Sequence, residues 1–339
     1  MIVANSTRTS SRLLTVMSPI PLIPLIIATL LSVHGLRSRS LSFSGAVTAF
    51  VVGFSILAVP VRTIGITLIV FYLIGSRATK YGKKRKAQLE DDYQDAGYRS
   101  GAQVLCNSFT AFLASGIWCL AFAPDTFPWS LVNSYIDSGS VLVNIVPYQD
   151  GQWCPMDATV SSGWSRALMF VSLGHFACCL GDTLASELGI LSSRPPILIT
   201  TLKTVPPGTN GGVSLGGTLA SLFGGFSMGV TMFISLIVEN AHCRSSWSTI
   251  LPSLVFWGSV AGVCGSLLDS FLGATLQRTR YSVDKKLILT GHSVLPDRGR
   301  RDTVKVISGL NLLTNNQVNL LSSIGTALVV ARFASTSET

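Results

Sequence analysis

Long apolar runs without charged residues constrain this chain more than any other feature. A helix needs about 20 apolar residues to cross the hydrocarbon core of a bilayer, and several stretches reach that length without an acid or a base. Only 12% of the 339 residues are charged, about half the share usual in soluble domains. The apolar runs cover about 16–33, 42–59, 64–74, 102–123, 164–180, 213–238, 250–272 and 304–330. We predict an all-α fold, a polytopic transmembrane helix bundle of seven or eight spans, with residues 1–339 forming a single integral membrane domain.

Three of these runs leave some choice. The first lacks a clear small-x-small cleavage site, so we interpret it as a retained helix and not as a signal peptide. The run at 64–74 is short. The run at 304–330 contains several asparagines, so it is either one broken helix or a partly buried amphipathic segment.

The charge distribution predicts the orientation. Nineteen of the 25 Lys and Arg residues fall on one alternating side of the predicted spans, whereas residues 124–163 hold four aspartates and no base. Because basic loops stay in the cytosol, we predict cytosolic loops at 75–101, 181–212 and 273–303, and a lumenal loop at 124–163. The N-terminus is then lumenal, where Asn5-Ser6-Thr7 fits a glycosylation sequon.

The same distribution bears on partners and location. The membrane topology accounts for the net charge of +9. The sequence shows no basic face with interleaved aromatic residues, so it does not predict nucleic-acid binding. We take the endoplasmic reticulum membrane as the default compartment, and the sequence leaves the oligomeric state open. Cys154 and Cys243 lie in loops on the lumenal side, which makes a disulfide between them a hypothesis, and no cysteine pattern has zinc-site spacing.

Two aspartates stand near the cytosolic ends of predicted spans. Asp182 shares a helical face with small residues at spacings of three, four and seven, and Asp269 lies on a similar stripe. The stripes are Asp182, Ala185, Ser186 and Gly189, and Gly262, Ser266, Asp269 and Gly273. Glu187 would point about 140° away from Asp182. A carboxylate at such a position is costly unless it is paired, hydrated or bound to a cation, and a salt bridge from Asp269 to a nearby base is the structural alternative.

A loop rich in proline and glycine precedes the span at 213–238. Free N–H groups at the start of a helix attract phosphate, and Lys203 adds a positive charge. The predicted nucleotide- or phosphate-binding residues are Lys203, Thr204, Gly208, Thr209, Asn210, Gly211, Gly212 and Ser214. The spacing is not that of a Walker A loop, and the glycines that follow could equally serve helix packing.

A third polar group is Arg99, Gln103 and Asn107, at the start of another span. These side chains could bind a substrate headgroup or a nucleotide, or could equally join neighbouring helices by hydrogen bonds. Two carboxylates, a lysine and an anion-binding loop together predict a magnesium–nucleotide site. In that hypothesis Asp182 and Asp269 hold Mg²⁺, and Asp182, Lys203 and Asp269 are the catalytic residues.

Several motifs carry a resemblance to a known family. They are residues 75–80, 103–107, 181–189, 207–217, 265–277 and 319–321. With these segments the chain resembles the transmembrane protein 19 family, also called domain of unknown function 92. That family includes the phytyl-phosphate kinase of plants and cyanobacteria, so the resemblance implies a kinase acting on an isoprenyl monophosphate.

A more distant similarity links the chain to dolichol kinases and phosphatidate cytidylyltransferases, which are membrane enzymes that use CTP. Their Asp-x-x-Ala-x-x-x-Gly element is matched by Asp182, Ala185 and Gly189. Their Lys-Thr loop is similar to Lys203, Thr204, Gly208 and Thr209, with one extra residue in the spacing. A later Gly-Asp-x-x-Glu-Ser element is matched only in part by Gly265, Asp269 and Ser270, because Ser266 stands where those enzymes have an acid.

The sequence therefore predicts a membrane-embedded lipid-phosphate kinase. It would transfer a phosphoryl group from CTP or ATP, with Mg²⁺, to a membrane lipid substrate such as phytyl phosphate. Two other hypotheses stay open: a transporter or channel using the same polar residues, and a non-catalytic membrane scaffold.

Overall fold

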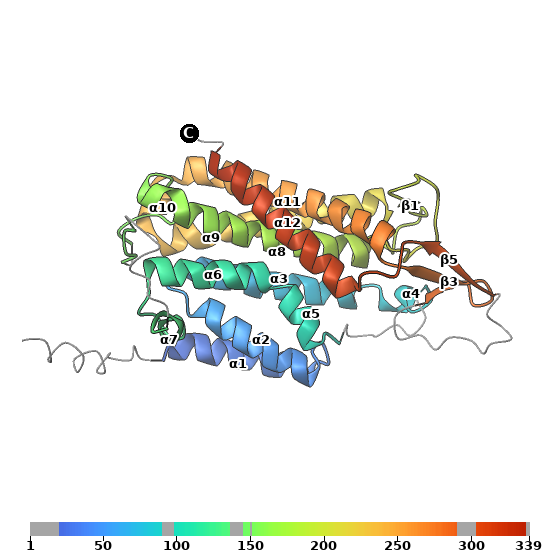
Figure 1. Ribbon diagram of the computed structural model, residues 1–339, viewed down its shortest axis with the longest axis horizontal. Coiled ribbons are helices and arrows are strands. Elements are labelled where there is room, and N and C mark those ends of the chain that lie inside the picture. Colours follow the sequence, from blue (N-terminus) through green and yellow to red (C-terminus); the bar gives the residue numbers. More distant parts are fainter. Residues whose placement is uncertain (1–19, 90–97, 136–144, 150, 290–302, 337–339) are drawn as a thin grey trace, which may run out of the picture.

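Long helices that run back and forth along one axis make up most of the protein (Figure 1). The computed structural model describes residues 20–89, 98–135, 145–149, 151–289 and 303–336. The long helices are α1 (Leu22–Arg37), α2 (Phe43–Leu57), α3 (Arg62–Lys80), α6 (Phe109–Phe122), α8 (Trp164–Gly189), α9 (Leu215–Glu239), α11 (Trp247–Leu276) and α12 (Asn315–Thr336). The short ones are α4 (Lys83–Lys86), α5 (Gly101–Cys106), α7 (Trp129–Asn133), α10 (Ala241–Ser245) and the 3₁₀ turn Val160–Gly163.

Four helices are long and apolar enough to cross a membrane: Val160–Gly189, Leu215–Glu239, Trp247–Leu276 and Asn315–Thr336. Three further apolar helices, α1, α2 and α6, have 14 to 16 residues. At 1.5 Å per residue such helices reach only about 21–24 Å, short of the roughly 30 Å hydrocarbon core. The predicted count of seven or eight spans therefore stays a prediction, while the helical membrane architecture holds.

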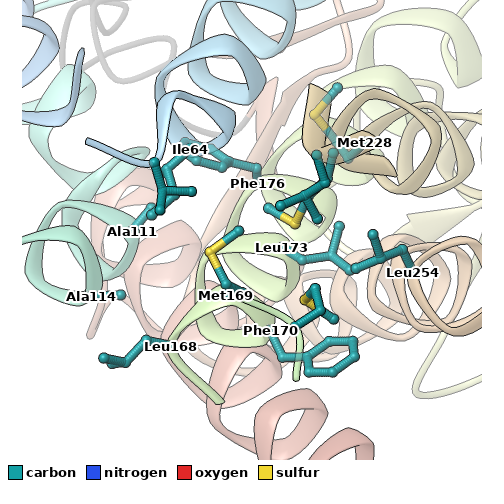
Figure 2. Packing of buried hydrophobic residues seen from close by; sticks show 14 of the residues in the cluster. Ile64, Ala111, Ala114, Leu168, Met169, Phe170, Leu173, Phe176, Met228 and Leu254 are labelled. Atoms are coloured by element: carbon teal, nitrogen blue, oxygen red, sulfur yellow. The ribbon is translucent and has the colours of Figure 1, made fainter. Parts of the chain in front are cut away.

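Helix α8 forms the centre of the bundle. Its neighbours α3, α6, α9, α11 and α12 surround it, and 16 of its 26 residues are buried. Figure 2 shows Met169, Leu173 and Phe176 of α8 meeting Ile64, Ala111, Met228 and Leu254 from four other helices. The middle of α8 is apolar on all its faces, which is typical of a helix enclosed by other helices.

Glycines bring three of these helices close together. A Cβ at Gly181 of α8 would lie 2.6 Å from the carbonyl oxygen of Gly262 on α11, and one at Gly224 of α9 would lie 3.0 Å from the Gly181 backbone. Small residues permit such close crossing in membrane bundles. Of the two explanations for the glycines after the loop, packing therefore applies to Gly224 and Gly225. Gly216 has open space beside it.

Two small sheets extend the helices at one end, which the all-α prediction missed. Strands β1 (Ile197–Leu198) and β2 (Gly212–Val213) pair antiparallel, and β3 (Thr279–Ser282) lies between β4 (Leu287–Leu289) and β5 (Val304–Ser308). The apolar run at 304–330 is therefore a strand followed by α12. Three of its first four residues, Val304, Val306 and Ile307, are β-branched, and such residues fit a pleated sheet.

Other predicted boundaries also move. The helices α3, α8 and α11 continue to Lys80, Gly189 and Leu276, so the loops predicted at 75–101, 181–212 and 273–303 begin as helix. The run at 102–123 is broken, because α5 ends at Cys106 and α6 begins at Phe109.

At the opposite end of the bundle, near α7 and α10 (Figure 1), a disulfide and a helix-capping carboxylate join neighbouring segments. The disulfide hypothesis is confirmed, since Cys154 and Cys243 are bonded. The carboxylate of Glu239 at the end of α9 accepts hydrogen bonds from the backbone N–H groups of Arg62 and Thr63, at 2.8 and 3.1 Å, and so caps the free start of α3. The Asn5 sequon lies outside the described residues.

Candidate functional site

A polar cavity of about 330 Å³ opens at the end of the bundle that carries the two small sheets. Its size falls in the range of small-molecule sites. The walls come from α3, α5, α8, α9, α11, α12 and the loop between α8 and α9. Of the predicted site residues, Arg99, Gln103, Asn107, Asp182, Gly208, Thr209, Asn210, Gly211, Gly212, Ser214 and Asp269 all line it.

The two aspartates face this cavity from neighbouring helices. Asp182 follows Gly181, where α8 and α11 touch, and its Oδ1 lies 3.5 Å from the hydroxyl of Ser266 on α11. Asp269 stands about one turn beyond Ser266, and its Oδ2 accepts a 2.9 Å hydrogen bond from the hydroxyl of Ser322 on α12. The close glycine crossing thus brings together two carboxylates that are 87 positions apart in the chain.

The loop of prolines and glycines forms another wall. Gly208 and Gly211 have positive φ angles of 85° and 79°, which glycine adopts without steric cost. A Cβ on Gly211 would also collide with Ala274 of α11. The loop therefore packs directly on the helix that carries Asp269.

Hydrogen bonds fix the shape of this loop. The N–H of Thr209 donates to the carbonyl of Pro206, and the N–H of Gly212 donates to the carbonyl of Thr209. The N–H of Asn210 donates to the hydroxyl of Thr279. The Ser214 hydroxyl caps α9 by accepting a 3.1 Å hydrogen bond from the N–H of Gly217. Most loop amides are thus engaged, contrary to the simple picture of a free anion-binding loop. Among the described residues, the amides of Gly208 and Gly211 have no hydrogen-bond acceptor.

Arg99 is the base that lines the cavity in the described part of the chain. Its guanidinium donates to the hydroxyls of Ser76 and Thr79 on α3, at 3.2 and 3.1 Å. The backbone of Arg99 pairs with Ser40 and Ser42 before α2, which holds the residue in place. Burial lowers the pKa of Arg99, and the charge of Glu187 opposes that shift.

Lys203 and Thr204 do not line the cavity. Both are exposed, at a tight turn in which Leu198 donates to the Lys203 carbonyl. Leu198 and Val205, on either side of the turn, are buried, so the turn directs the lysine into solvent. The positive charge that the sequence assigned to Lys203 is supplied inside the cavity by Arg99.

Several lining residues escaped the sequence prediction. Glu187 also borders the cavity and forms an ion pair with Lys86 of α4 at 2.6 Å. Gln277, Asn315 and Asn319 complete the wall beside Asp269. The asparagines within an apolar run were the available signal, because a buried amide in a membrane helix requires a polar partner.

The cavity suits a hard cation such as Mg²⁺. Neither Asp182 nor Asp269 forms an ion pair with a base in the described residues, so no side chain there neutralises their charge. Mg²⁺ is usually held by one or two carboxylates together with waters and substrate phosphates. No group of three or more His, Cys, Asp or Glu residues gathers in the described chain.

Comparison with known proteins places these features in a family context. The family model described as integral membrane protein DUF92 matches residues 26–327. Protein PGR of Arabidopsis thaliana is 35% identical over 311 residues, which cover 90% of this chain and 93% of that protein. An uncharacterized membrane protein of Methanocaldococcus jannaschii is 26% identical, covering 76% and 83% of the two chains.

A shorter match involves protein VTE6, chloroplastic, of Arabidopsis thaliana. It is 46% identical over 113 residues, which cover 32% of this chain and 29% of that protein. No solved structure matches the chain.

Proposed function

The chain belongs to the DUF92 family of integral membrane proteins, and from that premise we propose that it is a membrane-embedded lipid-phosphate kinase. The donor is CTP or another nucleotide such as ATP, and the acceptor is an isoprenyl monophosphate such as phytyl phosphate. The observation that carries the proposal is the convergence of Asp182, Asp269, Arg99 and the Gly208–Gly212 segment on one cavity.

The reaction is a phosphoryl transfer between two anions. An oxygen of the acceptor phosphate forms a bond to the γ-phosphorus of the donor, while the bond from that phosphorus to the bridging oxygen breaks. The products are an isoprenyl diphosphate and a nucleoside diphosphate. The acceptor oxygen is already anionic, so the reaction needs no strong general base, and positioning and charge neutralisation supply most of the catalysis.

The residues of the cavity divide these tasks. Asp182 and Asp269 would hold Mg²⁺, which when bound neutralises charge on the donor phosphates. The amides of Gly208 and Gly211, which have no acceptor among the described residues, would donate to a phosphate. Arg99 binds phosphate oxygens through its fork of N–H donors, while Gln103 and Asn107 add neutral donors beside it.

We propose that this end of the protein faces the cytosol. The described bases Lys86, Arg280 and Lys305 belong to α4, β3 and β5, which lie at the cavity end (Figure 1). The disulfide at the other end is typical of an oxidising compartment. One relative, protein VTE6 of Arabidopsis thaliana, is named as chloroplastic, so a plastid membrane and the endoplasmic reticulum are the two compartments to test with a fluorescent fusion.

An activity assay tests the function directly. The purified full-length chain in lipid nanodiscs is given Mg²⁺, labelled CTP or ATP and a panel of isoprenyl monophosphates, and labelled diphosphate is measured. Asp182→Asn and Asp269→Asn should each lower the rate about a hundredfold or more, because a bound metal contributes several kcal/mol to such transfers. Asp157→Asn is the matched control, since that aspartate belongs to the 124–163 loop and its Oδ1 bonds only within its own turn.

The outcome also separates the other hypotheses. No diphosphate from any donor and acceptor, while a homologous control enzyme is active, refutes the kinase. Solute uptake into liposomes without nucleotide would instead favour a transporter. A scaffold would keep its partner binding in both aspartate variants.

A further inference from the structure

A second cavity lies beside the polar one, between α1, α2 and α3. Its volume is about 110 Å³, and most of its wall is hydrocarbon. The residues of its wall include Ala49, Gly53, Gly75, Arg99, Asn107 and Thr183. It is therefore a space for an apolar group, next to a site for charged ones.

The two cavities share part of their walls. Arg99, Asn107 and Thr183 line both. Arg99 reaches this boundary from the segment before α5, and a Cβ on Gly75 of α3 would lie 4.0 Å from its Nη2. A molecule bound at the boundary would thus have an arginine at one end and hydrocarbon walls along the rest.

Asn107 supplies an independent sign that this boundary binds a ligand. Its Oδ1 atom is buried and has no hydrogen-bond partner among the described residues. A buried polar atom without a partner is uncommon and calls for an explanation. This atom is a carbonyl oxygen and can only accept, so a donor on a ligand, such as the P–OH group of a singly protonated phosphate, would satisfy it. The helix break between α5 and α6 places Asn107 at the boundary.

The apolar cavity also has room for an occupant. Gly53 of α2 is buried, yet a Cβ at this position would meet no heavy atom within 4 Å. A buried glycine beside empty space borders a void that its neighbours do not fill. Interiors normally pack without such gaps, so the void is available to a hydrocarbon chain.

From these observations we infer that the apolar cavity holds the phosphate-proximal part of the acceptor's isoprenyl chain, with its phosphate at Arg99 and Asn107. The identity of that headgroup rests on the proposed function. The anionic group then faces Asp182 and the glycine segment, while the rest of the chain leaves between α1, α2 and α3 toward the lipid. The acceptor enters from the membrane and the nucleotide from water, so the two substrates do not compete for one entrance.

Filling the void tests this assignment. Gly53→Leu places a side chain in the apolar cavity without a clash at its Cβ. Gly216→Leu is the matched control, because a Cβ there also meets nothing within 4 Å but the position is exposed on α9 and outside both cavities. Ala49→Leu, on the same wall as Gly53, is a second variant if Gly53→Leu does not fold.

The kinetic arm measures KM and kcat with phytyl phosphate and with the shorter geranyl phosphate. Gly53→Leu should raise KM for phytyl phosphate about tenfold or more, the effect of a misplaced methylene group in an apolar pocket. Values of kcat and of the nucleotide KM should stay within about twofold, since the polar cavity is untouched. Equal kinetics in Gly53→Leu and Gly216→Leu would overturn the inference.

A binding arm works without any reaction. Phytyl phosphate carrying a diazirine near its headgroup is photolysed with the full chain in phosphatidylcholine nanodiscs, without nucleotide, and the labelled peptides are sequenced. Label in α1–α3 that excess phytyl phosphate displaces supports the inference, even if no transfer is detected and the kinase proposal fails. Label elsewhere, or label in α1–α3 that only added phospholipid displaces, overturns it.

Discussion

The buried ion pair between Lys86 and Glu187 allows a quantitative test of how the cavity wall is held. The side chain of Lys86 is 2% exposed, and that of Glu187 is 24% exposed. The ammonium donates to Glu187 Oε2 at 2.6 Å and to the carbonyls of Ala78 and Thr79 at 3.0 and 3.3 Å. It therefore ties α4 to the end of α3 and to the face of α8 that lines the cavity.

The two partners should not be equivalent. Glu187→Gln leaves the ammonium of Lys86 buried with neutral acceptors only, and breaking a buried pair in this way costs about 3–5 kcal/mol. We expect about 3 kcal/mol, the lower end, because Glu187 has partial access to water. Lys86→Met frees a carboxylate that can turn toward the aqueous cavity, so a cost of about 1–2 kcal/mol is expected.

The assay is unfolding of the full chain by sodium dodecyl sulfate in mixed micelles, followed by circular dichroism. A double-mutant cycle with Lys86→Met and Glu187→Gln isolates the interaction, and the double variant should be more stable than Glu187→Gln alone. If the single effects simply add within about 0.5 kcal/mol, the pair contributes nothing specific. A larger loss in Lys86→Met than in Glu187→Gln would contradict the argument from burial.

Three further outcomes follow from the geometry. Gly211→Ala should destabilise the protein by about 1–3 kcal/mol, because its φ of 79° and its contact with Ala274 both exclude a side chain; Gly216→Ala, measured by the same unfolding assay, should not. Cys154→Ser should cost about 2–4 kcal/mol under non-reducing conditions, since the disulfide joins residues separated by 89 positions, and the difference from wild type should vanish in dithiothreitol. Dialysis against EDTA should abolish transfer and Mg²⁺ should restore it, whereas full activity in EDTA would remove Asp182 and Asp269 from the role of metal ligands.

The sequence predicted the helical membrane architecture because its signal is local. A predominantly apolar run favours a buried helix wherever it lies. The runs at 164–180 and 250–272 fall within α8 and α11, and all but the first two residues of the run at 213–238 fall within α9. The boundaries were less predictable, since α8 and α11 continue into polar residues that no apolar count includes. The strand Val304–Ser308 was missed because its pairing with β3 depends on a segment distant in the sequence.

The same distinction applies to the site. Helical spacing predicted that Asp182 and Asp269 each lie on a helix face made of small residues. Such faces allow the close glycine crossing between α8 and α11. Spacing could not decide between Lys203 and Arg99 as the base in the cavity. That choice depends on how the turn at Lys203 buries Leu198 and Val205, and on the pairing of Arg99 with the segment before α2, both of which are tertiary effects.

The position of the polar groups along α8 bears on the transporter hypothesis. A transport path requires polar residues or water across the middle of the membrane, with sites near the midplane. Asp182 instead stands in the last third of α8, and the turns below it carry Met169, Phe170, Leu173 and Phe176, all 0% exposed and packed against four neighbouring helices (Figure 2). The described core thus lies between Asp182 and the start of α8, with no exposed side chain among these four residues. A polar cavity with an apolar side pocket is suited to joining a soluble substrate to a membrane-held one, and a transporter would have to separate α8 from its neighbours to open a path past this core.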